Sequence, residues 1–147
     1  MAKILDTNSY LDTVCALLRE GHTHVPVTIA GTSMTPFLDP GDTVFLDLPG
    51  RPVEKGDVIL FLRLGRQYVL HRVVDVFPDG SLELLGDAQV CSEPVRPEDV
   101  CAVVTGARRG EKLLDGHSLR WRFFRDVWIH TRRIRPYVNR IRSKIKK

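Results

Sequence analysis

The spacing of apolar residues changes twice along this chain of 147 residues. Near its start, apolar residues recur every three or four positions, which is the period of a helix with one buried face. They are Leu11, Val14, Cys15 and Leu18. Thr7 or Asn8 can cap such a helix, and Gly21 can end it. A short N-terminal helix is therefore predicted, and residues 1–24 form the helix and its lead-in.

From residue 25 the apolar runs become short and rich in β-branched residues. Gly, Pro and Asp separate them, which is typical of strands joined by turns. The predicted strands cover residues 25–30, 43–48, 58–64, 68–77, 81–85 and 100–105. The longest uninterrupted apolar run, residues 58–62, is far shorter than the ~20 residues of a membrane-spanning helix. The pattern predicts a small, mainly β domain over residues 25–116.

Helical spacing resumes near Ser118 and continues to the end of the chain. The apolar positions are Phe124, Val127, Trp128, Ile134, Val138, Ile141 and Ile145. Arginines stand between them, and Pro136 should break or kink the run. Residues 117–147 are therefore predicted to form a basic amphipathic element, either two helices or one bent helix.

Charge divides the chain at the same place. Residues 1–119 carry 11 Lys or Arg and 17 Asp or Glu, a net charge of −6, whereas residues 120–147 carry 11 and 1, a net charge of +10. Three cysteines without C-x-x-C spacing argue against a zinc ribbon or a disulfide framework and favour a reducing compartment. The start of the chain meets Asp6 before an apolar stretch can form, so we expect no secretory signal and a cytoplasmic protein.

Candidate chemistry begins with the serine segment, residues 31–36, which reads Gly-Thr-Ser-Met-Thr-Pro. Small, backbone-permissive residues and a proline that discourages a helix surround Ser33, as a nucleophile requires. His71 follows 38 residues later and Asp87 another 16 residues on. A serine, a base and an acid are thus available for acyl transfer.

The predicted hairpin turn sets the strand register that brings His71 and Asp87 together. Pro78-Asp79-Gly80 suits a three-residue hairpin loop that pairs Phe77 with Ser81. Counting outward, His71 then lies opposite Asp87 on one face, with Cβ atoms roughly 5 Å apart. Asp87 would accept from the Nδ1–H of the imidazole and fix its tautomer. A two-residue turn would shift this register by one and flip one strand's faces.

The backbone around Ser33 can supply an oxyanion hole. Gly31 and Thr32 let a backbone N–H, together with that of Ser33, approach a developing oxyanion. The segment is not the nucleophile elbow of α/β-hydrolases, because Thr35 stands where that motif needs glycine and Pro36 discourages the following helix. Met34 can fill a gap in the core.

These residues resemble the ordered motifs of type I signal peptidases and self-cleaving SOS repressors. The matching stretches are Ser33-Met34-x-Pro36 with Gly41-Asp42, Gly56-Asp57-Val58-Ile59, His71-Arg72-Val73 and Gly86-Asp87. The resemblance covers about residues 25–106 and is closest to the branch that uses histidine where others use lysine. It implies a signal-peptidase-like β-domain, a Ser33 nucleophile, a His71 general base and a substrate held as an added strand.

The chain differs from that family in two respects. Glu93 stands where the Ser-His branch places a second aspartate, which leaves two candidate acids, Asp87 and Glu93, of which we favour Asp87. The membrane-spanning anchor of signal peptidases has no counterpart here, so the substrate can differ from a secretory leader. The resemblance implies a serine endopeptidase that needs no metal or organic cofactor and cleaves a leader or propeptide after small residues.

The basic C-terminal element allows three further interpretations. It can lie on an anionic membrane surface with its apolar face down, bind the phosphates of nucleic acid, or pack on the β-domain with its arginines in solvent. We expect the membrane surface, at residues 118–147 and on the cytoplasmic side, in preference to nucleic acid. The competing functional hypothesis is a non-catalytic β-domain that uses this element to bind nucleic acid or a protein partner. The sequence leaves the oligomeric state open.

Overall fold

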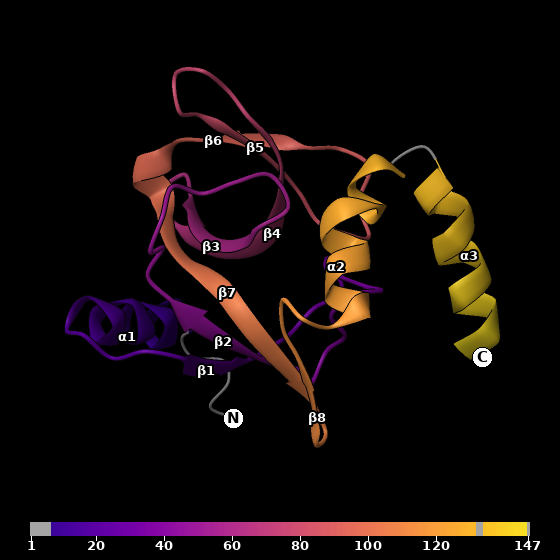
Figure 1. The fold of residues 1–147 in the computed structure, drawn as a ribbon, viewed down its shortest axis with the longest axis horizontal. Coiled ribbons are helices and arrows are strands. Elements are labelled where there is room, and N and C mark those ends of the chain that lie inside the picture. Colours follow the sequence, from indigo (N-terminus) through magenta and orange to yellow (C-terminus); the bar gives the residue numbers. More distant parts are fainter. Residues whose placement is uncertain (1–6, 132–133, 147) are drawn as a thin grey trace.

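The computed structural model describes residues 7–131 and 134–146. A helix, α1 (Thr7–Arg19), precedes a β-domain, and two helices, α2 (Leu119–Asp126) and α3 (Arg135–Lys146), follow it. In Figure 1, α1 and α2 lie on different sides of the strands, and α3 is the outermost element beside α2. None of the helices in the described part of the chain is long and apolar enough to cross a bilayer.

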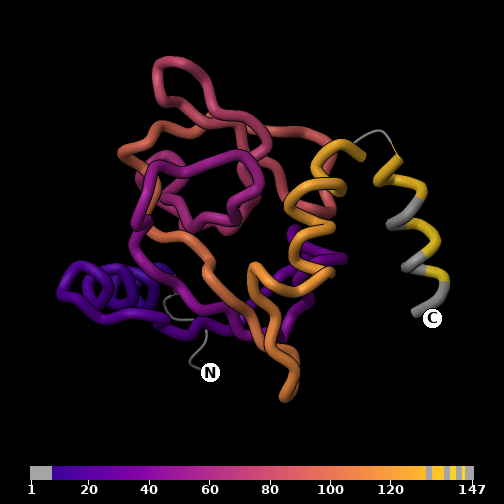
Figure 2. Tube along the Cα trace, viewed as in Figure 1, coloured from indigo at the N-terminus to yellow at the C-terminus, as the bar shows by residue number. Residues whose placement is uncertain are grey.

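The strands form a single antiparallel sheet. They are β1 (Val25–Thr28), β2 (Thr43–Asp47), β3 (Val58–Arg63), β4 (Gln67–Val76), β5 (Leu82–Leu85), β6 (Glu93–Val95), β7 (Val100–Arg109) and β8 (Lys112–Leu114). Their order in the sheet is β1-β2-β7-β3-β4-β5-β6, and β8 pairs with β7. The trace in Figure 2 shows the sheet curling into a rounded body. The mainly β fold class predicted from the sequence is confirmed.

The six predicted strands all occur, and two more were missed. β6 and β8 contain three residues each, which is too short for an alternating pattern to be recognised. The N-terminal helix ends as predicted, because Gly21 adopts a φ of 105° and its N–H and that of His22 bond to the carbonyls of Leu18 and Leu17. Such a left-handed turn after a helix favours glycine.

The core divides into two clusters that share strand β3. Val58 and Leu60 belong to a cluster with α1, β2, β7 and α2, whereas Ile59 and Phe61 belong to a second cluster with β5 and β6. Successive residues of a strand point to opposite faces. The continuous apolar run of β3 therefore covers both clusters and is buried on both sides.

The C-terminal element contains two helices, which settles the choice left open by the sequence. Ser118 stands immediately before α2, and Pro136 lies in the first turn of α3, where its missing N–H costs nothing. Phe124 and the following Trp128 are buried in the same cluster as α1. Helix α2 is therefore part of the packed body, as in the third interpretation of the basic element.

Candidate active site

The serine segment forms a compact turn at the surface of the β-domain. Gly31 has a φ of 84°, a conformation that favours glycine. The amide and the hydroxyl of Thr35 both donate to the carbonyl of Thr32, at 3.1 and 2.9 Å. Met34 is buried in the core, which anchors the turn and leaves its neighbour Ser33 half-buried. The Thr35–Pro36 peptide bond is cis.

Ser33 and His71 line one cavity, of about 280 Å³. Residues 29–31 form one wall of this cavity and residues 67–71 of β4 form another, while Gln89 and Arg63 contribute polar groups. The two side chains share the cavity without a direct hydrogen bond, and contacts between a nucleophile and its base are often loose before substrate binds. A larger cavity of about 420 Å³, beside Trp121 and Arg125, contains none of the predicted catalytic residues. The chemistry of the lining groups, rather than cavity size, identifies the candidate site.

His71 is a buried, neutral imidazole. Its side chain is only 3% exposed and its ring lies 6.0 Å from that of Phe61. Burial lowers the pKa of His71 to about 4, while the nearby Glu93 acts to raise this pKa and Arg63 acts to lower it. The Nδ1 atom finds no hydrogen-bond partner among the described residues. At neutral pH the ring can therefore accept a proton, as a general base must.

Asp87, the favoured partner of His71, is paired with Arg72 instead. The guanidinium of Arg72 donates to both carboxylate oxygens of Asp87 at 2.8 Å, and both side chains are buried. A third donor of Arg72 reaches the carbonyl of Gly56 at 2.9 Å. The prediction that Asp87 orients His71 is therefore wrong.

A bulge explains the error. The hairpin loop forms as predicted, with Phe77 bonded to Ser81, and Asp75 faces Glu83 in the expected register. Between Val73 and Asp75 the register shifts by one residue, so that Arg72 faces Leu85. A shift of one residue moves a side chain to the other face of the sheet. Asp87, two residues beyond Leu85, thus falls on the face of Arg72 and not on that of His71.

Glu93, the alternative acid, lies on the side of His71. Its Oε1 atom is 3.7 Å from the Nδ1 of His71, which is too long for a hydrogen bond. Arg63 holds the same carboxylate, with a bond of 3.0 Å from its Nε to Oε2 and a second from its Nη2 to Oε1. A small movement of Glu93 would bring it to the imidazole. Arg63 was not identified from the sequence, although it lies near the end of the predicted strand 58–64 and ends the observed β3.

The loop of residues 86–89, here called the site loop, contacts the serine segment through the carbonyl of Ser33. The N–H of Ala88 donates to the carbonyl of Ser33 at 2.9 Å. A Cβ at Gly86 would come within 2.5 Å of that carbonyl oxygen, so glycine is needed for close approach. Gln89 accepts from the N–H of Gly86 at 3.2 Å. The site loop therefore fixes where Ser33 stands.

Two residues of the C-terminal element hold the site loop in turn. Trp128 donates from its indole nitrogen to the carbonyl of Asp87 at 2.9 Å. Arg135, which is fully buried, donates to the carbonyls of Gly86 and Gln89 at 3.3 and 3.1 Å and to that of Trp128 at 2.8 Å. Its guanidinium also lies 5.3 Å from the centre of the Trp128 ring. The sequence pattern gave no indication of these contacts.

Among the described strands, none pairs with the part of the β4 edge that lines the cavity of Ser33. Residues 67–72 of β4 pair with β3 on one side, but its pairing with β5 begins only at Arg72. The unpaired edge of residues 67–71 lines the same cavity as residues 29–31. An extended peptide can pair with such an edge through its main chain.

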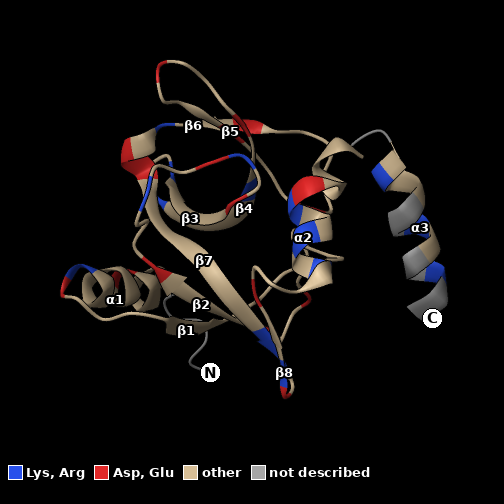
Figure 3. Cartoon of the chain, viewed as in Figure 1, with Lys and Arg blue, Asp and Glu red and all other residues tan. Residues whose placement is uncertain are grey.

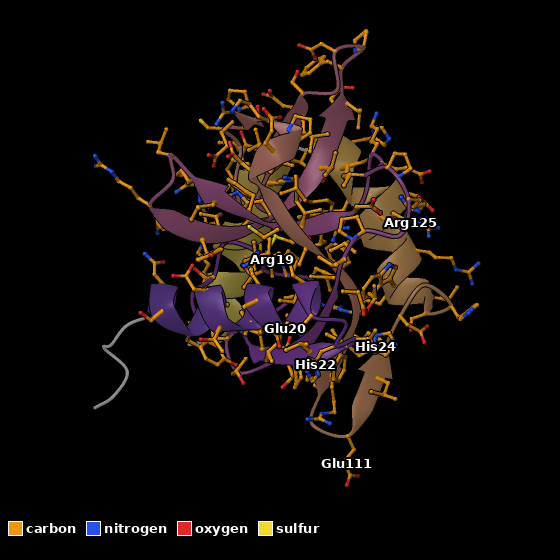
Figure 4. All side chains as sticks on the ribbon, turned by 90° about the vertical axis from the view of Figure 1, so that its left-hand side faces the viewer. Arg19, Glu20, His22, His24, Glu111 and Arg125 are labelled. Carbon is orange, nitrogen blue, oxygen red and sulfur yellow. The ribbon has the colours of Figure 1, made fainter. Side chains whose placement is uncertain are left out.

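Other histidines play no part in this site. His22 and His24 follow α1, as Figure 4 shows, and the Nδ1 atom of His24 lies 2.6 Å from Asp47. No group of His, Cys, Asp and Glu suited to a metal ion occurs within residues 7–131 and 134–146. The cysteines Cys15, Cys91 and Cys101 are free thiols.

The structure combines an antiparallel β-domain with a serine and a histidine that line one cavity. Comparison with protein families gives the class, since residues 2–105 match the model of the Peptidase S24-like family, which indicates a fold of the serine-peptidase type. The chain therefore belongs to that family, within the superfamily of SOS-repressor peptidases and signal peptidases that the sequence motifs indicated. Comparison with curated proteins and with solved structures gives no match.

Proposed function

We propose that this protein is a serine endopeptidase of the signal-peptidase type that cleaves a leader or propeptide. The observation that carries the proposal is the shared cavity of Ser33 and His71, which come from segments 38 residues apart. At neutral pH the ring of His71 is in the neutral form that can accept a proton, and closer approach of the Glu93 carboxylate would raise its pKa from about 4 toward the working pH. Family membership supports the reaction class.

The reaction proceeds through an acyl-enzyme. The Oγ of Ser33 attacks the scissile carbonyl carbon, and its proton passes to the Nε2 of His71, the ring nitrogen not turned to Glu93. The oxyanion binds N–H groups of residues 31–33. His71 then gives the proton to the departing amine, which leaves the acyl group on Ser33. Water attacks this ester with His71 again as base, releasing the acid and restoring the serine.

The substrate binds as an extended strand between the free edge of β4 and residues 29–31. Main-chain pairing supplies affinity without regard to sequence, and pockets for alternate side chains supply specificity. The cavity, of about 280 Å³, includes Met34 and Tyr68 in its lining. We expect small side chains to precede the cut. The reaction takes place in the cytoplasm or at the cytoplasmic face of a membrane.

A serine-directed probe tests the nucleophile. A fluorophosphonate should label the native protein, with labelling abolished in Ser33→Ala and strongly reduced in His71→Gln. Ser81→Ala is the matched control, because this hydroxyl bonds to Asp79 in the hairpin loop away from the cavity. Absence of labelling, or labelling that persists in Ser33→Ala, would contradict the proposal and favour a non-catalytic binding domain.

Glu93 is the acid that we assign to His71 during turnover. Replacing it with Gln removes the charge that stabilises the imidazolium, so the rate of labelling should fall with little loss of folding stability, since the carboxylate is partly exposed. The test is labelling rate against pH, together with the melting temperature. An unchanged rate in Glu93→Gln would show that a Ser-His dyad acts without an acid.

A further inference from the structure

The two C-terminal helices and the residues beside them expose large apolar side chains to solvent. Phe124 on α2 and Trp128, two residues after the end of α2, are buried in the core, and Arg120 donates to the carbonyls of Pro36 and Phe37. The neighbouring side chains remain in solvent. These six residues, 44% to 80% exposed, are Leu119, Phe123, Val127, Ile134, Tyr137 and Ile141.

Their spacing makes two stripes. Leu119 and Phe123 are four residues apart on α2, and Val127, the residue that caps the end of α2, continues this spacing. Tyr137 and Ile141 are four residues apart on α3, and Ile134 stands immediately before this helix. Figure 1 shows the two helices on the same side of the molecule, with α3 outermost. We refer to the six side chains of both groups together as the apolar stripe.

Basic residues flank the apolar stripe. Arg122 on α2 and Arg140 and Lys144 on α3 are exposed, and the guanidinium of Arg140 lies 5.8 Å from the centre of the Tyr137 ring. In Figure 3, blue recurs along both helices, with a single red band at the end of α2. An apolar face bordered by cations is the pattern of a helix that lies in a membrane interface.

The charge distribution determines which side of the molecule would face a charged surface. Residues 1–119 carry a net charge of −6 and residues 120–147 a net charge of +10. An anionic surface therefore attracts the helices and repels the β-domain, which orients the molecule. A second copy fits poorly, because it would bring two basic faces together. Nucleic acid would neutralise the arginines but would leave the aliphatic and aromatic side chains uncovered.

We propose that the apolar stripe docks α2 and α3 on an anionic lipid surface. The stripe inserts among the acyl chains, and the flanking arginines and lysines bind lipid phosphates. Helix α2 also contains the residues that pack on the β-domain, so the catalytic body is held at a fixed orientation to the bilayer. This docking does not depend on the proposed peptidase activity.

Vesicle sedimentation of the full chain tests the proposal. Vesicles of phosphatidylcholine with roughly a third phosphatidylglycerol should bind the protein at about 0.1 M salt, and pure phosphatidylcholine should not. The double variant Tyr137→Ser/Ile141→Ser should weaken binding about tenfold or more. Arg140→Gln/Lys144→Gln should weaken it about fivefold for each charge removed. Leu64→Asn, at an exposed leucine in the turn between β3 and β4, is the matched control and should bind as the native chain does.

Three results would overturn the proposal. The first is no sedimentation with anionic vesicles. The second is equal vesicle binding by the native chain and the Tyr137→Ser/Ile141→Ser variant. In that case, displacement of both proteins from the vesicles by duplex DNA would assign the basic face to nucleic acid. The third is a fall of several degrees in the melting temperature of this variant with vesicle binding intact, which would show that the stripe packs within the molecule.

Discussion

Replacing His71 with Gln should change how folding stability depends on pH. In the folded chain, burial lowers the pKa of His71 to about 4, against 6.5 for an ordinary histidine. As the pH falls, His71 therefore binds a proton at a higher pH in the unfolded chain than in the folded chain. The stabilising effect of the neutral ring is complete above pH 6.5 and is lost as the pH falls through about 4.

The size of this effect follows from the two pKa values. Relative to neutral pH, the native chain should lose roughly 1 kcal/mol near pH 5.5 and roughly 2–3 kcal/mol near pH 4.5 from this one group. The His71→Gln variant has no such proton to bind. Other titrating groups change stability in both proteins and largely cancel in the difference.

Urea denaturation at several pH values measures this difference. The free energy of unfolding of the native chain should approach that of His71→Gln, or fall below it, as the pH is lowered from about 7.5 to about 4.5. His117→Gln, at an exposed histidine, should follow the native chain throughout. Parallel curves for the native chain and His71→Gln would refute a buried neutral imidazole, and with it the base proposed for the reaction.

Three other substitutions test the architecture around the site. Asp87→Asn leaves Arg72 buried without its counter-ion and should lower the free energy of unfolding by about 3–5 kcal/mol in urea denaturation; a loss below about 1 kcal/mol would contradict the buried pair. Gly86→Ala places a Cβ 2.5 Å from the Ser33 carbonyl oxygen. It should lower the free energy of unfolding by about 1–3 kcal/mol in urea denaturation and slow probe labelling. Labelling at the native rate would show that the serine segment is not supported by this loop. Trp128→Phe removes the bond to the site loop and should cost about 1–3 kcal/mol, and an unchanged melting temperature would rule that bond out.

The fold was largely predictable because local patterns determine its elements. The alternation of residues 68–77, the turn at Asp79 and Gly80, and the glycine after α1 each depend on neighbours in the sequence. The partner of His71 was not predictable in the same way. The bulge between Val73 and Asp75 has no glycine or proline to indicate it, and one inserted residue exchanges the faces of everything beyond it.

The contacts of the C-terminal element could not be predicted from the sequence for a different reason. A basic amphipathic helix has the same sequence pattern whether its apolar face meets a core, a membrane or a partner. Phe124 and Trp128 pack on the β-domain, whereas Phe123 and Val127, one position before each, remain exposed. Only the three-dimensional arrangement separates these two sets of residues.

The contacts of Trp128 and Arg135 with the site loop also order events during synthesis on the ribosome. Ser33 and His71 emerge before the side chains that hold the site loop, which are translated after residue 127. A growing chain with Ser33 already outside the ribosome therefore lacks the contacts that position this serine. Probe labelling of stalled chains should begin only once residue 135 has emerged, and full labelling of a chain stalled before residue 128 would contradict this. Under the proposed peptidase function, such a delay would spare neighbouring nascent proteins from premature cleavage.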